Sequence, residues 1–479
     1  MHRVVSSACL LAGALAALLL AAPGASAHAQ LKGATPAAGA ALAHAPRQVV
    51  FRFSEPVEGR FGAVTVYDGR GTRVSGGHAG HVNGVSSTFG TTLPADLPAG
   101  RYAATYRVIS ADGHPISGGI VFSVGGGVLR GAGPSLRRLL GGTEAGPVTR
   151  GAFAAVRALD DLATALAIGL LCFLLWCWRP ALRAASGGGR DWRKASEVFA
   201  AGSTRLLRSA IAAGAATAYL GILFQGAVAD GSTLWAALDP AVLADTLATR
   251  FGIVWAAKLA MWIALGGALV RVAPLRAFAL RPAALGADGL ALGRPGAGQT
   301  LALALPAGVL ALAPALAGHA STQGDAPVLV PALVVHVVAM SAWLGGLVAL
   351  LLLVPRAAHR LTAPADRTRL LVAVLERFSP LALGAVLALV STGTLQSVLY
   401  LHAFGDLVRE GFGRAVLAKI LLVLALVVLG AVNRRRAVPR LQRLAGGDER
   451  PGGPGRLLRR TVATEIVLLL GALAATGIL

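Results

Sequence analysis

The chain has 479 residues, 55% of them hydrophobic, and a formal net charge of +22. Its mean hydropathy of +0.67 is too high for a soluble protein, and its length exceeds that of a single domain. The basic residues stand between long apolar runs and form no single polar face, so the charge does not indicate a nucleic-acid-binding protein.

Residues 1–27 are predicted to be a secretory signal peptide. Arg3 supplies the positive charge, Ala8 to Ala22 form a short apolar run, and Ala25-Ser26-Ala27 fits the small-residue cleavage rule. An uncleaved anchor helix is the alternative, but the apolar run is short for a membrane span. Cleavage after Ala27 makes His28 the first residue of the mature chain.

Residues 28–125 are predicted to form a small, all-β antiparallel sandwich of the immunoglobulin-like kind. Short segments of strand-forming residues alternate with turns that contain Gly, Pro and Asp. The strands are expected at 48–53, 63–67, 101–108 and 120–124. A Gly- and Arg-rich linker over 126–150 then leads to the apolar half of the chain.

The segment Ser110-Ala-Asp-Gly-His-Pro115 carries the strongest chemical signal in this domain. Asp112 and His114 are two residues apart, so in an extended segment both side chains point to the same side. One oxygen and one nitrogen ligand suit Cu(II), Ni(II) or Zn(II). If His28 is the mature N-terminus, its α-amine and ring Nδ1 add two nitrogens, and the resulting set favours Cu(II).

These residues resemble the CopC family of exported copper-binding domains. The resemblance rests on His28-Ala29, on Phe53-Ser-Glu-Pro-Val57, and on Ser110 to Pro115 with Gly118. It implies a β-sandwich that binds Cu(II) through His28, Asp112 and His114. Some members of the family have a Met-rich loop for Cu(I), which this chain lacks. His78 and His81 are an alternative second metal pair, although a solvated Gly-rich turn is the favoured explanation.

Residues 151–479 are predicted to be an all-α polytopic membrane domain with eight transmembrane helices. Each apolar run is long enough to cross a hydrocarbon core of about 30 Å. With an exported N-terminal domain, eight helices place the C-terminus outside. The Arg-rich loops after odd-numbered helices then lie in the cytoplasm, as the positive-inside rule requires. The helices are expected at 153–178, 206–228, 250–272, 299–317, 328–354, 378–400, 414–432 and 459–478.

Two histidines and one methionine of this half could carry a metal. His319 is expected at the outer end of the fourth helix, and His336 about 12 Å below the outer end of the fifth helix at 1.5 Å per residue. Met340 shares the face of His336, and the two form a soft pair for Cu(I). The alternatives are a hydrogen bond from His336 to a neighbouring helix and a space-filling role for Met340. Gly345-Gly346 predict close helix packing.

Charged residues in the apolar segments have two explanations. Lys258 lies on the third predicted helix and Asp160-Asp161 lie near the start of the first. They could be counter-ions or groups on a pathway. For the lysine, a side chain that extends to the membrane surface is the simpler explanation.

This half resembles the CopD family of copper-resistance and copper-uptake membrane proteins. The motifs are Gly318-His-Ala-Ser321, His336 with Trp343-Leu-Gly-Gly346, Arg377-Phe-Ser379, Lys419 and Asn433. CopC and CopD units also occur fused in this order. The resemblance implies a protein of the bacterial cell (inner or plasma) membrane that moves copper, usually inward, in copper uptake, homeostasis or resistance.

The expected function is therefore capture of Cu(II) outside the membrane and passage of copper across it, with no catalytic residue. Cu(I) in the membrane domain would require a reductant, and a copper-receiving protein is a second expected partner. A copper sensor or resistance module without transport is an alternative. A copper-brace oxidative enzyme is less favoured, because Asp112 would fill a position that oxygen chemistry needs open. A b-type cytochrome is disfavoured because only His336 lies well inside a helix.

Overall fold

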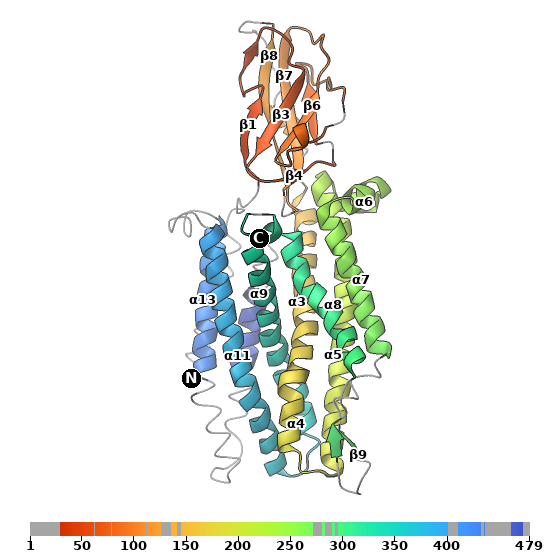
Figure 1. Cartoon of the computed structure of the whole chain (residues 1–479), viewed down its shortest axis with the longest axis vertical. Helices are drawn as coiled ribbons and strands as arrows, with labels where there is room; N and C mark the ends of the chain where they lie inside the picture. Colours follow the sequence, from red (N-terminus) through yellow and green to blue (C-terminus); the bar gives the residue numbers. More distant parts are fainter. Residues whose placement is uncertain are drawn as a thin grey trace.

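The computed structural model describes two parts, a β-sandwich and a helical bundle that carries the sandwich at one end (Figure 1). Each part has its own cluster of buried apolar side chains. The described residues are 29–61, 63–77, 79–110, 113–125, 136–140, 145–271, 280–282, 290–292, 296–322, 324–400, 411–432, 435 and 461–472.

The sandwich consists of two sheets. One has the strand order β1-β3-β6, and the other has the order β2-β8-β7-β4, with β5 also paired to β7. The strands are β1 Leu31–Thr35, β2 Ala41–Leu42, β3 Gln48–Phe53, β4 Val57–Glu58, β5 Val64–Tyr67, β6 Thr88–Thr92, β7 Gly100–Ser110 and β8 Pro115–Val124. The four predicted strands are all present. One pairing departs from the antiparallel expectation, because the two-residue β2 runs parallel to the end of β8 where the chain crosses between the sheets.

Aromatic residues fill the space between the two sheets. Phe51 and Phe53 of β3 point inward, as their alternation with polar neighbours predicts. Tyr106 of β7 packs against both rings, with centroid distances of 4.9 and 5.1 Å. The sandwich thus has a hydrophobic core of its own, whose described members all lie between Ala29 and Val124.

Long helices make up the second part. Two of them continue through a turn of π-helix, η2 Leu174–Trp178 and η6 Ala349–Leu353. The helices are α2 Leu136–Leu140, α3 Pro147–Phe173, α4 Arg179–Ala185, α5 Gly189–Asp230, α6 Pro240–Leu247, α7 Arg250–Arg271, α8 Ala297–Ala317, α9 Ala326–Val348, α10 Val354–Ala358, α11 Pro364–Tyr400 and α13 Gly411–Val432, with short 3-10 turns at η3 Leu234–Leu238 and η5 His319–Ser321.

Among the described residues, six stretches of helix are long and apolar enough to span a membrane, and they match the first six predicted spans. The shorter apolar helices Val416–Gly430 and Thr461–Ala472 fall at the last two predicted positions, so the number of eight remains a prediction. Several helices are longer than predicted, for example 147–185 in place of 153–178. An apolar run marks only the part of a helix that lipid surrounds, whereas the helix itself continues into polar sequence.

Two segments between the spans differ from the expectation of plain loops. The predicted linker contains α2, which packs against β7 and β8, and α3 already begins at Pro147, a residue suited to the first turn of a helix. Between α7 and α8, a short hairpin of β9 Leu280–Pro282 and β10 Leu290–Leu292 lies at the end of the bundle farthest from the sandwich (Figure 1).

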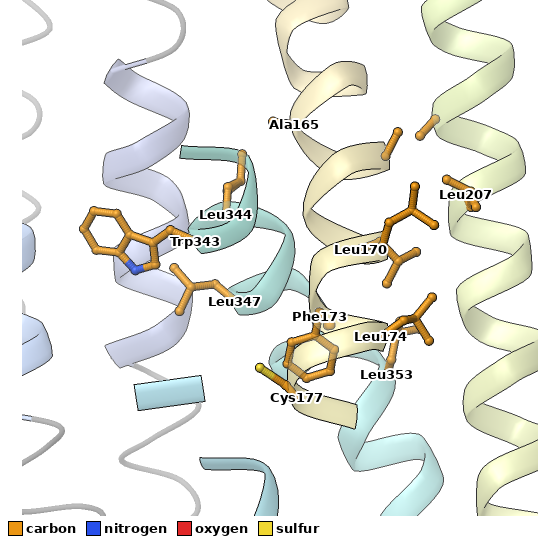
Figure 2. Packing of buried hydrophobic residues seen from close by; sticks show 14 of the residues in the cluster. Ala165, Leu170, Phe173, Leu174, Cys177, Leu207, Trp343, Leu344, Leu347 and Leu353 are labelled. Carbon is orange, nitrogen blue, oxygen red and sulfur yellow. The ribbon is translucent and has the colours of Figure 1, made fainter. Parts of the chain in front are cut away.

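The centre of the bundle is α3, which packs against α5 and α9. Gly169 of α3 meets the backbone of α9 so closely that a Cβ added to it would lie 1.9 Å from the Ser341 carbonyl oxygen. A Cβ on Gly345 would lie 2.6 Å from Gly169, which confirms the predicted close packing at this glycine. Leu170 and Phe173 of α3 belong to the same apolar core, and Leu170 lies on the side of α3 that faces Leu207 of α5 (Figure 2).

Candidate functional site

The described residues of the predicted metal-binding segment, Ser110 and Gly113 to Pro115, lie at the turn where β7 ends and β8 begins. The Ser110 N–H donates to the His114 carbonyl at 2.8 Å, and the Gly113 N–H donates to the Ser110 carbonyl at 2.8 Å. Gly113 has φ of 86°, the left-handed region that favours glycine. This turn leaves the His114 side chain half-buried next to the helical bundle.

Two of the three predicted ligands, His28 and Asp112, lie outside the described residues. The three-ligand set therefore remains a prediction. The residue that follows His28 is described, and it lies against the same turn, because the Ala29 N–H donates to Ser110 Oγ at 3.4 Å. Within the described ranges, no group of three or more His, Cys, Asp or Glu side chains is placed to hold a metal ion.

A short polar chain connects this turn to the helical bundle. Ser110 Oγ donates to Glu55 Oε1 at 2.5 Å, and Glu55 Oε2 lies 3.4 Å from His319 Nδ1. Both side chains of the latter pair are less than one-fifth exposed. Ala29, Ser110, Glu55 and His319 thus form a continuous series of contacts from the predicted copper site to η5, the short turn that follows α8.

The sandwich rests on one end of α5 and one end of α7 through polar contacts. Gln225 of α5 donates to the Gly113 carbonyl, and Arg107 Nε of β7 donates to the Ala229 carbonyl at 2.7 Å. The Arg250 N–H at the start of α7 donates to the Glu58 carboxylate at 3.1 Å. A guanidinium at the carboxyl end of α5 and a carboxylate at the amino end of α7 both complement the helix dipoles.

Arg107 keeps its charge in this interface. Burial lowers the pKa of its guanidinium, and the charge of Asp230 partly opposes that shift. Because an arginine pKa lies far above neutral, Arg107 remains a cation that donates to carbonyls at the end of α5.

A second arginine reaches the predicted copper ligand from the bundle side. Arg157 of α3 places its Nη1 3.5 Å from His114 Nε2. The same guanidinium lies 5.8 Å from the ring centroid of Phe153, one turn earlier on α3. His114 therefore faces a cation of the helical bundle.

His336 is held deeper in the bundle by a neighbouring helix. Its Nδ1 lies 2.9 Å from Thr392 Oγ1 of α11, and that hydroxyl donates to the Ala388 carbonyl at 2.6 Å. Because the hydroxyl has a single proton, which it donates to the Ala388 carbonyl, it accepts a hydrogen bond from His336 Nδ1. Met340 is partly buried against the main core, as a space-filling side chain would be.

Three family models match the chain. Residues 31–125 match the CopC domain, residues 148–292 match the copper resistance protein D-like N-terminal domain, and residues 372–479 match copper resistance protein D. The chain is a CopC domain fused to a CopD-type membrane domain. Its function is therefore copper-related and lies at a membrane that the CopD part crosses more than once.

Relatives and solved structures were also found. The chain is 28% identical to "Copper transport protein CutJ" of Bacillus subtilis (strain 168) over 94% of its own length and 74% of that protein. Crystal structures of CopC from Methylosinus trichosporium OB3b (31% identity, TM-score 0.19) and of PcoC, a methionine-rich copper resistance protein from Escherichia coli (30% identity, TM-score 0.18), each cover 20% of the chain. They are covered over 93% and 99% of their own lengths, respectively.

The CopD part contains a buried ion pair that confirms the counter-ion explanation of Lys258 and Asp160 and excludes the surface-reaching one. The Lys258 ammonium of α7 does not extend to the membrane surface; it is 3% exposed and bonds to the carboxylate of Asp160 on α3. Thr217 of α5 donates to the other oxygen of Asp160 at 3.2 Å. The surface-reaching explanation failed because the partner lies 98 positions away in the sequence. The pair joins three helices in the core of the bundle.

Two other histidines, His81 and His359, have neighbours that differ from those of the candidate copper route. In the CopC domain, His81 Nδ1 lies 2.9 Å from the Thr88 carbonyl and its ring packs on Phe89, while its predicted partner His78 lies outside the described residues. In the CopD part, His359 lines a hollow of about 410 Å³ together with three arginines, Arg205, Arg356 and Arg360. Such a cationic lining repels a copper ion.

Sequence reasoning missed the residues that attach the CopC domain to the bundle. Glu55 belongs to the motif that carried the CopC resemblance, so it could have been noticed, whereas Arg107, Arg157 and Gln225 belong to no motif. Their partners are mostly backbone carbonyls or residues more than 40 positions away.

Proposed function

We propose that this chain captures Cu(II) outside a bacterial cell membrane and passes copper inward through its CopD part, without catalysing a reaction. Capture uses His28, Asp112 and His114, and the route continues through His319 and His336. Copper is the transported substrate.

The docking of the His114 turn onto the bundle carries this proposal. The turn is in contact with α3, α5 and α7 through Arg157, Gln225 and Phe251. The contacts from Ala29 through Glu55 to His319 bring the first histidine of the CopD part close to the capture turn. A copper ion that leaves the CopC domain here meets a nitrogen ligand before it meets bulk water.

The proposed orientation of the chain in the membrane rests on the charges at the two ends of the bundle. The end that carries the CopC domain is exported if residues 1–27 are a signal peptide. The opposite end is rich in cations, which the positive-inside rule assigns to the cytoplasm, and with eight spans the C-terminus is outside. These cations are Arg190, Arg193, Lys194, Arg356, Arg360, Arg367 and Arg369.

The ligands change character along the route. Three nitrogens and one oxygen at the capture site suit Cu(II), whereas an imidazole with a thioether, as in His336 and Met340, suits Cu(I). Passage through the second site therefore includes a one-electron reduction by an external reductant. On the inner side, a copper-receiving protein would accept the ion.

Two alternatives make different predictions. A sensor or resistance module binds copper at the CopC domain but moves none across the membrane. A copper-brace enzyme consumes oxygen in the presence of a reductant, although Asp112 in the coordination plane opposes that chemistry.

The decisive experiment measures copper uptake into sealed vesicles that contain the purified chain. The variants are His114→Ala, His336→Ala and, as a control at the cationic inner end, His359→Ala. We expect both route variants to lose uptake, with only His114→Ala also losing the Cu(II) EPR signal, while His359→Ala behaves like the intact chain. Equal uptake by all four chains would exclude transport by this route, and copper-dependent oxygen consumption would favour the enzyme.

A further inference from the structure

The contact between Arg157 and His114 joins the capture turn to the membrane domain. Arg157 Nη1 of α3 lies 3.5 Å from Nε2 of the predicted copper ligand. Arg157 belongs to the helix at the centre of the bundle, and its guanidinium is partly covered by Phe153. The contact is thus part of the docked arrangement of the two domains and would be absent from a free CopC domain.

The chemistry of the two groups makes this contact incompatible with bound copper. A guanidinium has five N–H donors and no acceptor, so the nitrogen that it contacts must offer a lone pair. If copper binds His114 through Nε2, the ion takes that lone pair. If copper binds through Nδ1, a neutral imidazole carries its proton on Nε2, and two donors then face each other. In both cases copper and Arg157 compete for His114, and the like charges of the two cations add repulsion.

We propose that Arg157 is a positioning residue for copper release, which lowers the copper affinity of the CopC domain when that domain is docked on the bundle. This inference rests on the proposed capture site. By linkage, docking weakens copper binding and bound copper weakens docking to the same extent. A loaded CopC domain therefore releases its ion when it is docked, at the position where Glu55 contacts His319.

The neighbouring contacts favour the docked state independently of copper. Gln225 bonds to the Gly113 carbonyl, Arg107 to the Ala229 carbonyl, and Glu58 to the Arg250 N–H. None of these three contacts uses a predicted copper ligand. They hold the turn against α3 and so keep Arg157 near His114.

The test is a Cu(II) titration of the full-length chain in detergent against a competing chelator, with the EPR signal as the readout. Arg157→Ala should bind Cu(II) about fivefold more tightly or better, within the range typical of coupled sites. Arg157→Lys keeps a cationic donor and should stay close to the intact chain. Arg150→Ala, an exposed position on the same helix, should leave the affinity unchanged. A merely structural role of Arg157 predicts weaker or equal binding, and either result would overturn the inference.

A second measurement tests the inference without a substitution, so that it applies even if Arg157→Ala fails to fold. The isolated CopC domain, residues 28–125, has its own core and should bind Cu(II) more tightly than the intact chain by the same factor. Equal affinity of the two would also overturn the inference. Failure of the intact chain to bind Cu(II) at all would instead refute the capture site, and binding without vesicle uptake would refute transport while leaving the affinity comparison valid.

Discussion

Replacement of Gly113 by alanine separates the strain of the turn from the docking of the two domains. Gly113 has φ of 86°, and Gly71, on the CopC surface, has φ of 85°. An L-residue in this region costs about 1–2 kcal/mol, so both alanine variants should destabilise the isolated CopC domain by a similar amount. In a domain of this size, 1 kcal/mol corresponds to a decrease in Tm of about 4–8 °C.

Only the alanine at position 113 also meets the bundle. Its Cβ would lie 3.0 Å from Phe251 Cδ2, whereas nothing lies within 4 Å of a Cβ at Gly71. Phe251 is fixed between Phe153 and Trp255, with centroid distances of 6.1 and 4.9 Å, so it has little room to move. Overpacking of this kind costs about 1–3 kcal/mol, and here that cost falls on docking.

The assay for docking is hydrogen exchange at the outer ends of α5 and α7 in the full-length chain. With Gly113→Ala, the amides near Ala229 and Arg250 should exchange faster, because their contacts with Arg107 and Glu58 are weakened. With Gly71→Ala they should exchange as in the intact chain. Identical exchange in the two variants would refute the docked arrangement, whatever the thermal unfolding shows.

Three further substitutions test the packing. Arg107→Ala removes the hydrogen bonds of this side chain to the end of α5 and should weaken docking by about 2 kcal/mol, measured as faster hydrogen exchange of the amides at that end. Arg107→Lys should recover part of this loss. Unchanged hydrogen exchange in Arg107→Ala would argue against the contact. Gly169→Ala should destabilise the bundle by about 1–3 kcal/mol in thermal unfolding. The control Gly384→Ala, which has open space around its Cβ, should be neutral or stabilising. Equal effects of the two substitutions would contradict the close helix contact. Lys258→Met should lower the free energy of unfolding by about 3–5 kcal/mol, because it leaves the Asp160 carboxylate buried and unpaired. The double variant Asp160→Leu with Lys258→Met should recover much of that stability. A double variant in which the two single losses add would exclude the pairing.

The elements of both domains could be predicted because their signals are local. Alternation of apolar residues gave β3, and apolar runs of about twenty residues gave the six long spans, since both patterns depend on neighbours in sequence. The same reasoning missed helix ends beyond the lipid region, such as Pro147, and it missed the parallel pairing of Ala41–Leu42, which depends on where the chain crosses between sheets.

The arrangement of the site could be predicted only in part. Asp112 and His114 were predicted from the chemistry of the metal and His28 from the signal-peptide cleavage rule, and the three-ligand set stays a prediction because His28 and Asp112 lie outside the described residues. The docking contacts could not be found, because an arginine on a strand such as Arg107 carries no sign that it will bond to carbonyls more than 120 positions later. For Lys258 the counter-ion explanation is confirmed, and the sequence could not decide for it because its partner Asp160 lies 98 positions away.

The central claim is that copper crosses directly from the CopC domain to the CopD part in a single route. It is tested most directly by the initial rate of copper uptake into vesicles for His114→Ala, His319→Ala and the double variant. If the two histidines act in series, the initial uptake rate of each single variant should fall about tenfold or more, as the loss of a metal-site partner typically causes. The double variant should then be no slower than the slower single variant. Uptake at the intact rate in either single variant, or losses that multiply in the double variant, would contradict the account.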